Sequence, residues 1–173
     1  MIIDCDEVHG GCRGGLMEYS LDWIKQNGGI MSEKDYRFRG YKGSCKKKEE
    51  KYVDLKVTGY KRLGTPGKKW DCVDENQVKE FLYENGPLIA ALNGDYLKSY
   101  TGGIFDGPAD CTPGGINKAV VIVGYGNEGS INMDYWIVKN SWGKDWGELG
   151  YFRIRRGTGT CGINCYIMTA TIE

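Results

Sequence analysis

The chain has 173 residues, with 23 Lys and Arg against 23 Asp and Glu, so its formal net charge is zero. A balanced charge removes the attraction on which dedicated nucleic-acid binders and binders of anionic membranes depend. The longest clear apolar run, residues 119–123, is far shorter than the roughly 18 residues that a membrane span needs. With 27 glycines and 12 tyrosines, the composition indicates a loop-rich and β-rich globular protein.

Seven cysteines are many for a cytosolic chain of this length and indicate an oxidising compartment. Because the number is odd, at least one cysteine is expected to lack a partner in the monomer. Residues 1–6 carry neither a basic region nor an apolar region, so we do not expect them to be a signal peptide. A single histidine and no paired CxxC spacing argue against a zinc site, and no metal or other cofactor is expected.

Two helices are predicted in the first half of the chain. Residues 14–27 have a helical apolar stripe that includes Leu21 and Ile24, and glycines follow at the end. A second helix is predicted to begin at Asp74, because Gln77 three residues later completes a capping-box pattern. Residues 32–51 between them are polar and are expected to form a loop.

Strands are predicted in the remainder, within 51–63 and at 88–92, 119–124, 135–140, 151–155 and 167–172. Helices followed by strands favour an α+β fold class. Residues 124–129 match the G-x-G-x-x-G pattern of dinucleotide sites, but that site requires a helix directly afterwards. Strand-like residues follow instead, so a β-hairpin is predicted and a dinucleotide-binding oxidoreductase is not.

One segment is far more specific than these patterns. Residues 140–148, Asn-Ser-Trp-Gly-Lys-Asp-Trp-Gly-Glu, resemble the Asn-Ser-Trp-Gly-x-x-Trp-Gly-Glu segment of papain-like cysteine proteases. Further stretches agree in the order of that family, and the agreement leans toward its cathepsin L and cathepsin F branch. These stretches are residues 4–6, 11–17, 27–30, 85–88, 119–126 and 150–154.

The resemblance implies a papain-like α+β fold with two lobes. Residues 1–50 would be the remnant of a helical left lobe, and residues 51–173 an antiparallel β-barrel right lobe. Gly14, Gly15, Leu16 and Met17 match residues that line the substrate cleft of the family, as does Trp142.

The family's reaction needs a cysteine thiolate, a histidine that exchanges the proton, and an asparagine that orients the histidine. Asn140 matches the orienting asparagine, whereas Lys118 occupies the position at which the family pattern has histidine. The nucleophile of the relatives lies upstream of residues 4–6, so its segment is expected to lie outside this chain. The lone histidine, His9, is expected to be an exposed loop residue. The resemblance therefore implies loss of peptidase activity.

The resemblance also implies disulfides Cys5–Cys45 and Cys111–Cys161. It places the partner of Cys12 in the upstream segment. It assigns no partner to Cys72 or Cys165, and a bridge between these two stays open.

Two functions follow from different classes of protein. The first is a pseudoprotease, an inactive protease homologue that acts as a binding or assembly module. The alternative is the C-terminal part of a cysteine endopeptidase whose nucleophile segment is supplied separately. Lys118 favours the first, because a truncation does not change a residue far from the cut. The Lys118 ammonium is then expected either to donate to Asn140 and lie over Trp142, or to extend into solvent.

The resemblance also leads us to expect a binding partner. Without the family's long central helix, an apolar groove beside residues 14–27 would be uncovered. We expect a protein partner, a second copy of the chain or a complementing segment to fill this groove. We expect neither a nucleic acid nor a membrane as a partner. The cysteine content and the resemblance together predict a secretory, lysosomal or vacuolar, or extracellular location.

Overall fold

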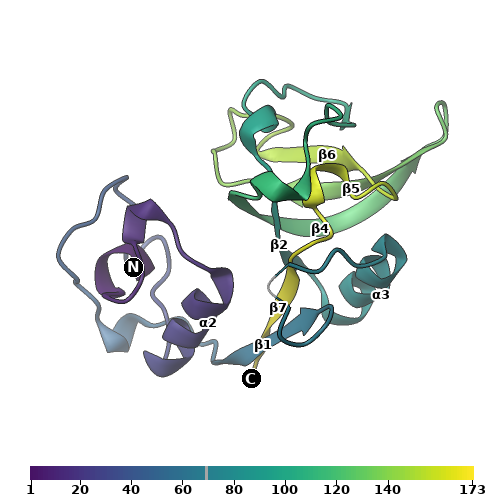
Figure 1. Ribbon diagram of the computed structural model, residues 1–173. Helices are drawn as coiled ribbons and strands as arrows, with labels where there is room; N and C mark the ends of the chain where they lie inside the picture. The colour runs from purple at the N-terminus through teal and green to yellow at the C-terminus, as the bar shows by residue number, and fades with distance from the viewer. Residues whose placement is uncertain (69) are drawn as a thin grey trace. The chain divides into compact units, whose positions relative to one another are not determined.

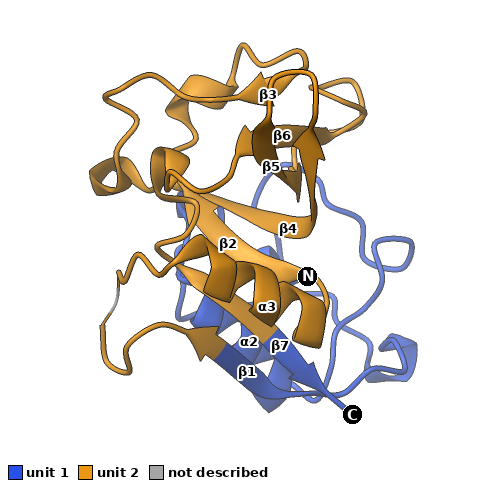
Figure 2. Ribbon diagram, turned by 90° about the vertical axis from the view of Figure 1, so that its right-hand side faces the viewer, with its two compact units in different colours: residues 1–61, 170–173 blue, residues 62–169 orange. Residues whose placement is uncertain are grey.

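The computed structural model describes residues 1–68 and 70–173 (Figure 1). Two compact units make up the chain: residues 1–61 together with 170–173, and residues 62–169 (Figure 2). The family-based division at residue 50 is a different partition and stays a prediction. Each unit is described by itself below.

The first unit contains the short helix α1 (Ile2–Cys5) and the helix α2 (Met17–Gln26), with a 3-10 turn η1 (Gly11–Arg13) between them. The helix predicted over residues 14–27 begins later, at Met17. Its start is delayed because Gly14 has a φ of 96° and Leu16 is extended. Leu21 and Ile24 are buried, as the apolar stripe predicts. A second 3-10 turn, η2 (Glu49–Lys51), closes the polar loop.

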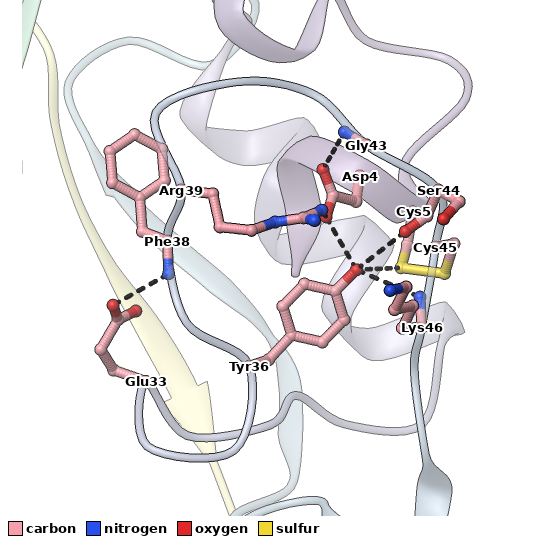
Figure 3. A network of polar contacts seen from close by, with 10 residues as sticks. All are labelled: Asp4, Cys5, Glu33, Tyr36, Phe38, Arg39, Gly43, Ser44, Cys45 and Lys46. Carbon is pink, nitrogen blue, oxygen red and sulfur yellow. Dashed lines mark hydrogen bonds and ion pairs between the residues drawn. A yellow bond between two sulfur atoms is a disulfide. The ribbon is translucent and has the colours of Figure 1, made fainter.

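A charged network fixes this loop to α1 (Figure 3). The buried Asp4 carboxylate accepts hydrogen bonds from the Gly43 amide at 2.7 Å, and from the Tyr36 hydroxyl and the Arg39 guanidinium at 2.9 Å each. The Gly43 hydrogen bond, with smaller contributions from Tyr36 and Arg39, outweighs burial and lowers the pKa of Asp4. Because the loop has little regular structure, this carboxylate and the Cys5–Cys45 disulfide are among the contacts that hold it in place.

The second unit contains the helix α3 (Glu75–Asn85), which begins where the sequence predicts. The Asp74 carboxylate caps it by accepting from the Asn76 amide at 2.7 Å. The helix ends at Gly86, whose φ of 76° suits glycine. Val78 and Leu82 are buried and join the core that α3 forms with the sheet.

The strands form a mixed sheet with the order β1-β7-β2-β4-β5-β6-β3 within the described residues. They are β1 (Val57–Leu63), β2 (Leu88–Leu92), β3 (Ile104–Phe105), β4 (Lys118–Glu128), β5 (Met133–Lys139), β6 (Tyr151–Arg155) and β7 (Ile167–Ile172). The predicted α+β class is confirmed. The predicted antiparallel barrel differs in two details, because β3 runs parallel to β6 and the sheet is not a closed barrel.

The G-x-G-x-x-G stretch lies in a hairpin, as predicted. Gly124 through Glu128 continue β4 and pair with β5, and the register shifts between Ile122 and Gly124. The core beneath the second unit's strands is almost entirely apolar. Its fully buried members include Val78, Leu88, Leu92, Leu97, Ile122, Trp136, Val138, Phe152, Ile154, Ile163 and Ile167.

One carboxylate enters this core. Glu75, only 6% exposed, accepts from the Trp136 indole at 2.6 Å. It also accepts from the backbone amides of Gly157 at 2.9 Å and Gly159 at 2.6 Å. The first turn of α3 is thereby joined to β5 and to the turn after β6.

The disulfides within the described part of the chain are Cys5–Cys45 in the first unit, and Cys72–Cys165 and Cys111–Cys161 in the second. Two of these pairs are those that the family resemblance implies, and the third resolves the pairing that the sequence leaves open. Cys12 is the free cysteine among the described residues and is exposed. In residues 1–68 and 70–173, no helix has the length and apolar character to cross a membrane, and no group of three or more potential metal ligands is found.

Candidate functional site

The sheet brings Lys118 and residues 140–142 to one end of the β4–β5 pair. β4 begins at Lys118 and β5 ends at Lys139, whose Cα partner on β4 is Val121. Since the strands are antiparallel, the start of β4 lies beside the chain that leaves β5. Asn140 and Ser141 therefore arrive at Lys118 from the neighbouring strand.

Asn140 is buried and held at both ends. Its backbone N–H donates to the Gly150 carbonyl at 2.9 Å, and its side-chain Oδ1 accepts from the Ser141 backbone N–H at 2.7 Å. Its Nδ2 is buried and has no hydrogen-bond partner in the described structure. The Asn140 side chain therefore fixes the backbone at Ser141 while one of its own donor groups stays unused.

Lys118 contacts two residues of the segment that follows β5. Its Nζ donates to Ser141 Oγ at 2.6 Å and lies 5.0 Å from the Trp142 ring centroid. The expected contact with Trp142 is thus confirmed, whereas the expected hydrogen bond to Asn140 is made to Ser141 instead. Burial lowers the pKa of Lys118. The base of the lysine side chain lies against Gly94, where a Cβ would come within 2.6 Å of the Lys118 Cβ.

The aromatic residues after Ser141 form a stack that leads into the core. The Trp142 and Trp146 rings meet edge to face at 5.0 Å, and Trp146 in turn contacts Tyr100 and Phe152. Trp142 is 38% exposed, so one side of its ring is open to solvent. The Trp-Gly-Glu spacing has a steric cause, because a Cβ at Gly147 would lie 2.6 Å from the Tyr151 carbonyl oxygen.

Glu148 anchors the loop that carries these tryptophans. Its carboxylate accepts from Arg153 Nη2 at 2.8 Å and Nε at 3.0 Å, and from the Gly103 amide at 3.0 Å. The Arg153 hydrogen bonds outweigh burial and lower the pKa of Glu148. Such a bidentate pair fixes orientation as well as charge.

The other predicted site residues lie in the first unit. Gly14 follows η1, Gly15 and Leu16 lead into α2, and Met17 is the first residue of that helix. Gly14 and Gly15 are exposed, and Leu16 and Met17 are half-buried. Their role in a substrate cleft stays a prediction.

His9 lies in a loop, as predicted, but the prediction that it is exposed is wrong. Its ring is 21% exposed, pairs through Nδ1 with the buried Asp6 carboxylate, and stacks on Tyr19 with centroids 5.1 Å apart. Asp6 experiences opposing effects: burial raises its pKa, but hydrogen bonds from the His9 ring and from the Val8 and His9 amides prevail and lower it. His9 therefore fixes the loop before η1.

Sequence patterns alone miss the part that Ser141 plays. Its hydroxyl is the hydrogen-bond partner of Lys118, and the residue is exposed. The position of Ser141 just after β5, which runs antiparallel to the strand that begins with Lys118, is the signal that could have identified it.

Comparison with known proteins identifies the scaffold. The model of the family described as papain family cysteine protease matches residues 1–171. The chain belongs to this family. A viral cathepsin of Adoxophyes honmai nucleopolyhedrovirus is 39% identical over 163 residues, which cover 94% of this chain and 44% of that protein. A probable cysteine protease of Arabidopsis thaliana is 37% identical, with coverage of 99% and 48%.

A solved structure agrees with the sequence relatives. The digestive procathepsin L2 proteinase of Tenebrio molitor larval midgut superimposes with a TM-score of 0.86 at 36% identity. The match covers 98% of this papain-family chain and 51% of that structure. The papain-like fold is therefore confirmed, and the chain spans about half the length of the curated relatives that it matches.

Proposed function

We propose that this papain-family chain is a pseudoprotease, a protease scaffold without thiol-peptidase activity that serves in binding or assembly. The observation that carries the proposal is Lys118, at the position where the family pattern has its histidine, with its ammonium bound to Ser141 and Trp142. A thiol peptidase needs an imidazole there to take a proton from the cysteine and return it to the leaving amine.

The surroundings of Lys118 support this assignment. The Asn140 Oδ1, which would orient an imidazole, accepts instead from the Ser141 amide at 2.7 Å. The lysine nitrogen is directed to a serine hydroxyl 2.6 Å away. The Asn140 oxygen and the Lys118 nitrogen are therefore both engaged with Ser141.

A second candidate is supported by the coverage of the relatives. The chain matches 44% and 48% of two relatives, so a nucleophile segment supplied separately could complete the fold. In that case the chain would be the C-terminal part of a cysteine endopeptidase, with Asn140 and Trp142 retained for catalysis.

A complementation assay separates the two candidates. The 173-residue chain and its Lys118→His variant are each mixed with the nucleophile-bearing segment of an active relative. Turnover of a fluorogenic dipeptide amide, and its block by a thiol-directed epoxide, are then measured. The pseudoprotease proposal expects no turnover by the unchanged chain and a gain with Lys118→His. Epoxide-sensitive turnover by the unchanged chain would refute it and support the endopeptidase alternative.

The binding role is supported by exposed apolar side chains in each unit. On β4, Val123 is 37% and Tyr125 39% exposed, and on α2, Tyr19 is 47% exposed. We propose that a second copy of the chain, another protein or a complementing segment covers such residues. Sedimentation velocity at tens of micromolar tests self-association, and a monodisperse monomer would exclude the second copy.

The proposed location follows from the covalent structure. The disulfides persist only where the surroundings are oxidising, which favours a secretory, lysosomal or vacuolar, or extracellular compartment. The names of the relatives, which include cathepsins, agree with that proposal.

A further inference from the structure

Ser141 and Lys118 together have the geometry of a nucleophile and its base. The Ser141 Oγ to Lys118 Nζ distance is 2.6 Å, within the range in which a base removes a hydroxyl proton. Serine–lysine pairs are a known variant of serine-based acyl transfer. We propose that Ser141 and Lys118 form a serine–lysine dyad that accepts acyl groups from ester substrates, an activity separate from the thiol chemistry of the family.

The two residues are placed by rigid elements. Lys118 is the first residue of β4, where it pairs with Leu92 of β2, and its side chain packs on Gly94. Ser141 is the second residue after β5, and the Asn140 side chain fixes its amide at 2.7 Å. A nucleophile and a base held by neighbouring strands keep their spacing without a conformational change.

The environment of the lysine suits a base. Burial lowers the pKa of Lys118, which increases its neutral fraction at a given pH. In the neutral form, the same 2.6 Å contact is made with the serine hydroxyl as donor and the amine lone pair as acceptor. Ser141 itself is exposed, so a substrate can approach its oxygen.

The reaction balances with water as the only co-reactant. Ser141 Oγ bonds to the acyl carbon while its proton passes to Lys118 Nζ, and the bond from the acyl carbon to the leaving oxygen breaks. The Lys118 ammonium returns the proton to the departing alcohol. Water then attacks the acyl-serine, Lys118 takes a proton from that water and delivers it to Ser141 Oγ, and a carboxylic acid leaves.

The surroundings of the pair offer two features that a small acyl ester can use. The partly exposed Trp142 ring supplies an apolar wall beside Lys118. The Lys118 ammonium also lies where it can attract negative charge that develops on the substrate. A short aliphatic ester with an activated leaving group presents these two features to the dyad.

The chain contains a matched control serine. Ser130 is exposed like Ser141, but its hydroxyl donates to the Glu128 carboxylate at 2.9 Å and has no amine as partner within residues 1–68 and 70–173. Activation by a neighbouring lysine therefore predicts a difference between these two serines within one molecule.

The test uses a fluorophosphonate probe with the intact 173-residue chain, and mass spectrometry locates the adducts. We expect Ser141 to be labelled at least about 100-fold faster than Ser130, which is the lower end of the contribution of a general base. Ser141→Ala should abolish that adduct. Lys118→Arg, which keeps the charge and the donors but cannot act as a base, should slow it to the rate of Ser130.

A second measurement follows turnover of p-nitrophenyl butyrate and the butyryl adduct on Ser141. Wild-type hydrolysis above that of Ser141→Ala is expected, and Ser130→Ala should match wild type. Equal labelling of Ser141 and Ser130 in the wild-type chain would overturn the proposal, even if a variant failed to fold. Unchanged Ser141 labelling in Lys118→Arg would also overturn it.

Discussion

The buried carboxylate of Glu75 offers a quantitative test of how the second unit is held together. It accepts from one indole and two backbone amides, from Trp136, Gly157 and Gly159. Replacement by leucine keeps a side chain of similar size in the core but removes every acceptor. We therefore expect Glu75→Leu to destabilise the protein more than Glu75→Gln does.

The magnitude follows from the donors that lose their partner. Trp136 is fully buried and Gly159 half-buried, whereas Gly157 is exposed and can turn to water. Two stranded donors at about 1–3 kcal/mol each predict a loss of roughly 2–6 kcal/mol for Glu75→Leu. In Glu75→Gln, the amide oxygen can retain both backbone donors, but its NH₂ group faces the Trp136 indole N–H. The predicted loss is then about 1–3 kcal/mol.

Urea unfolding followed by tryptophan fluorescence measures both variants. Glu84→Leu on the same helix is the control, because Glu84 is exposed and a surface change of this kind alters stability by about 0.5 kcal/mol or less. A Glu75→Leu variant as stable as Glu84→Leu would refute the reasoning. Equal losses for Glu75→Leu and Glu75→Gln would show that the hydrogen bonds donated by the Gly157 and Gly159 amides do not matter.

Two further predictions concern pH and thiol chemistry. The pKa of Glu148 is lowered from its ordinary value of 4.5, so the unfolded chain takes up this proton at a higher pH than the folded chain. Its stabilisation is complete above 4.5 and is lost as pH falls through the folded pKa. Because the pair is about one-third exposed, Glu148→Gln should cost about 1 kcal/mol or less at pH 7 and flatten the acid decline of stability, as thermal unfolding at stepped pH would reveal. Native maleimide labelling should add one adduct, on Cys12, and labelling at Cys72 or Cys165 would contradict the disulfide that joins them.

The elements that the sequence predicts well are those with a local cause. Asp74 begins α3 because its carboxylate caps the helix, and β2, β6 and β7 match the predicted ranges residue for residue. The sequence does not predict the start of α2, because the positive φ of Gly14 depends on the preceding η1 turn. The sequence does not predict the parallel β3–β6 pair either, since a strand of two residues is too short to show a hydrophobic pattern.

In the candidate site as well, some features are predicted by local motifs and others depend on the fold. Asn140, Trp142 and Lys118 were identified by their positions in motifs, and the contact of Lys118 with Trp142 followed from the chemistry of an ammonium beside an indole. The Lys118–Ser141 hydrogen bond depends instead on the register of β4 against β5, which no local pattern specifies. The same holds for His9, because only the fold of the loop brings its ring to the Asp6 carboxylate.

The order of the two compact units along the chain has a mechanical consequence. Residues 62–169 are inserted within the sequence of the first unit, which resumes at residue 170. Each disulfide joins cysteines of the same unit, so the backbone at residues 61–62 and 169–170 provides the two covalent connections between units in the described chain. No disulfide of the described residues bridges the first connection, so a single proteolytic cut at residues 61–62 would release residues 1–61, with the Cys5–Cys45 disulfide, from residues 62–173. A cut at residues 169–170 would remove residues 170–173, and cleavage at both connections would give three pieces, of which the 62–169 piece retains its own two disulfides.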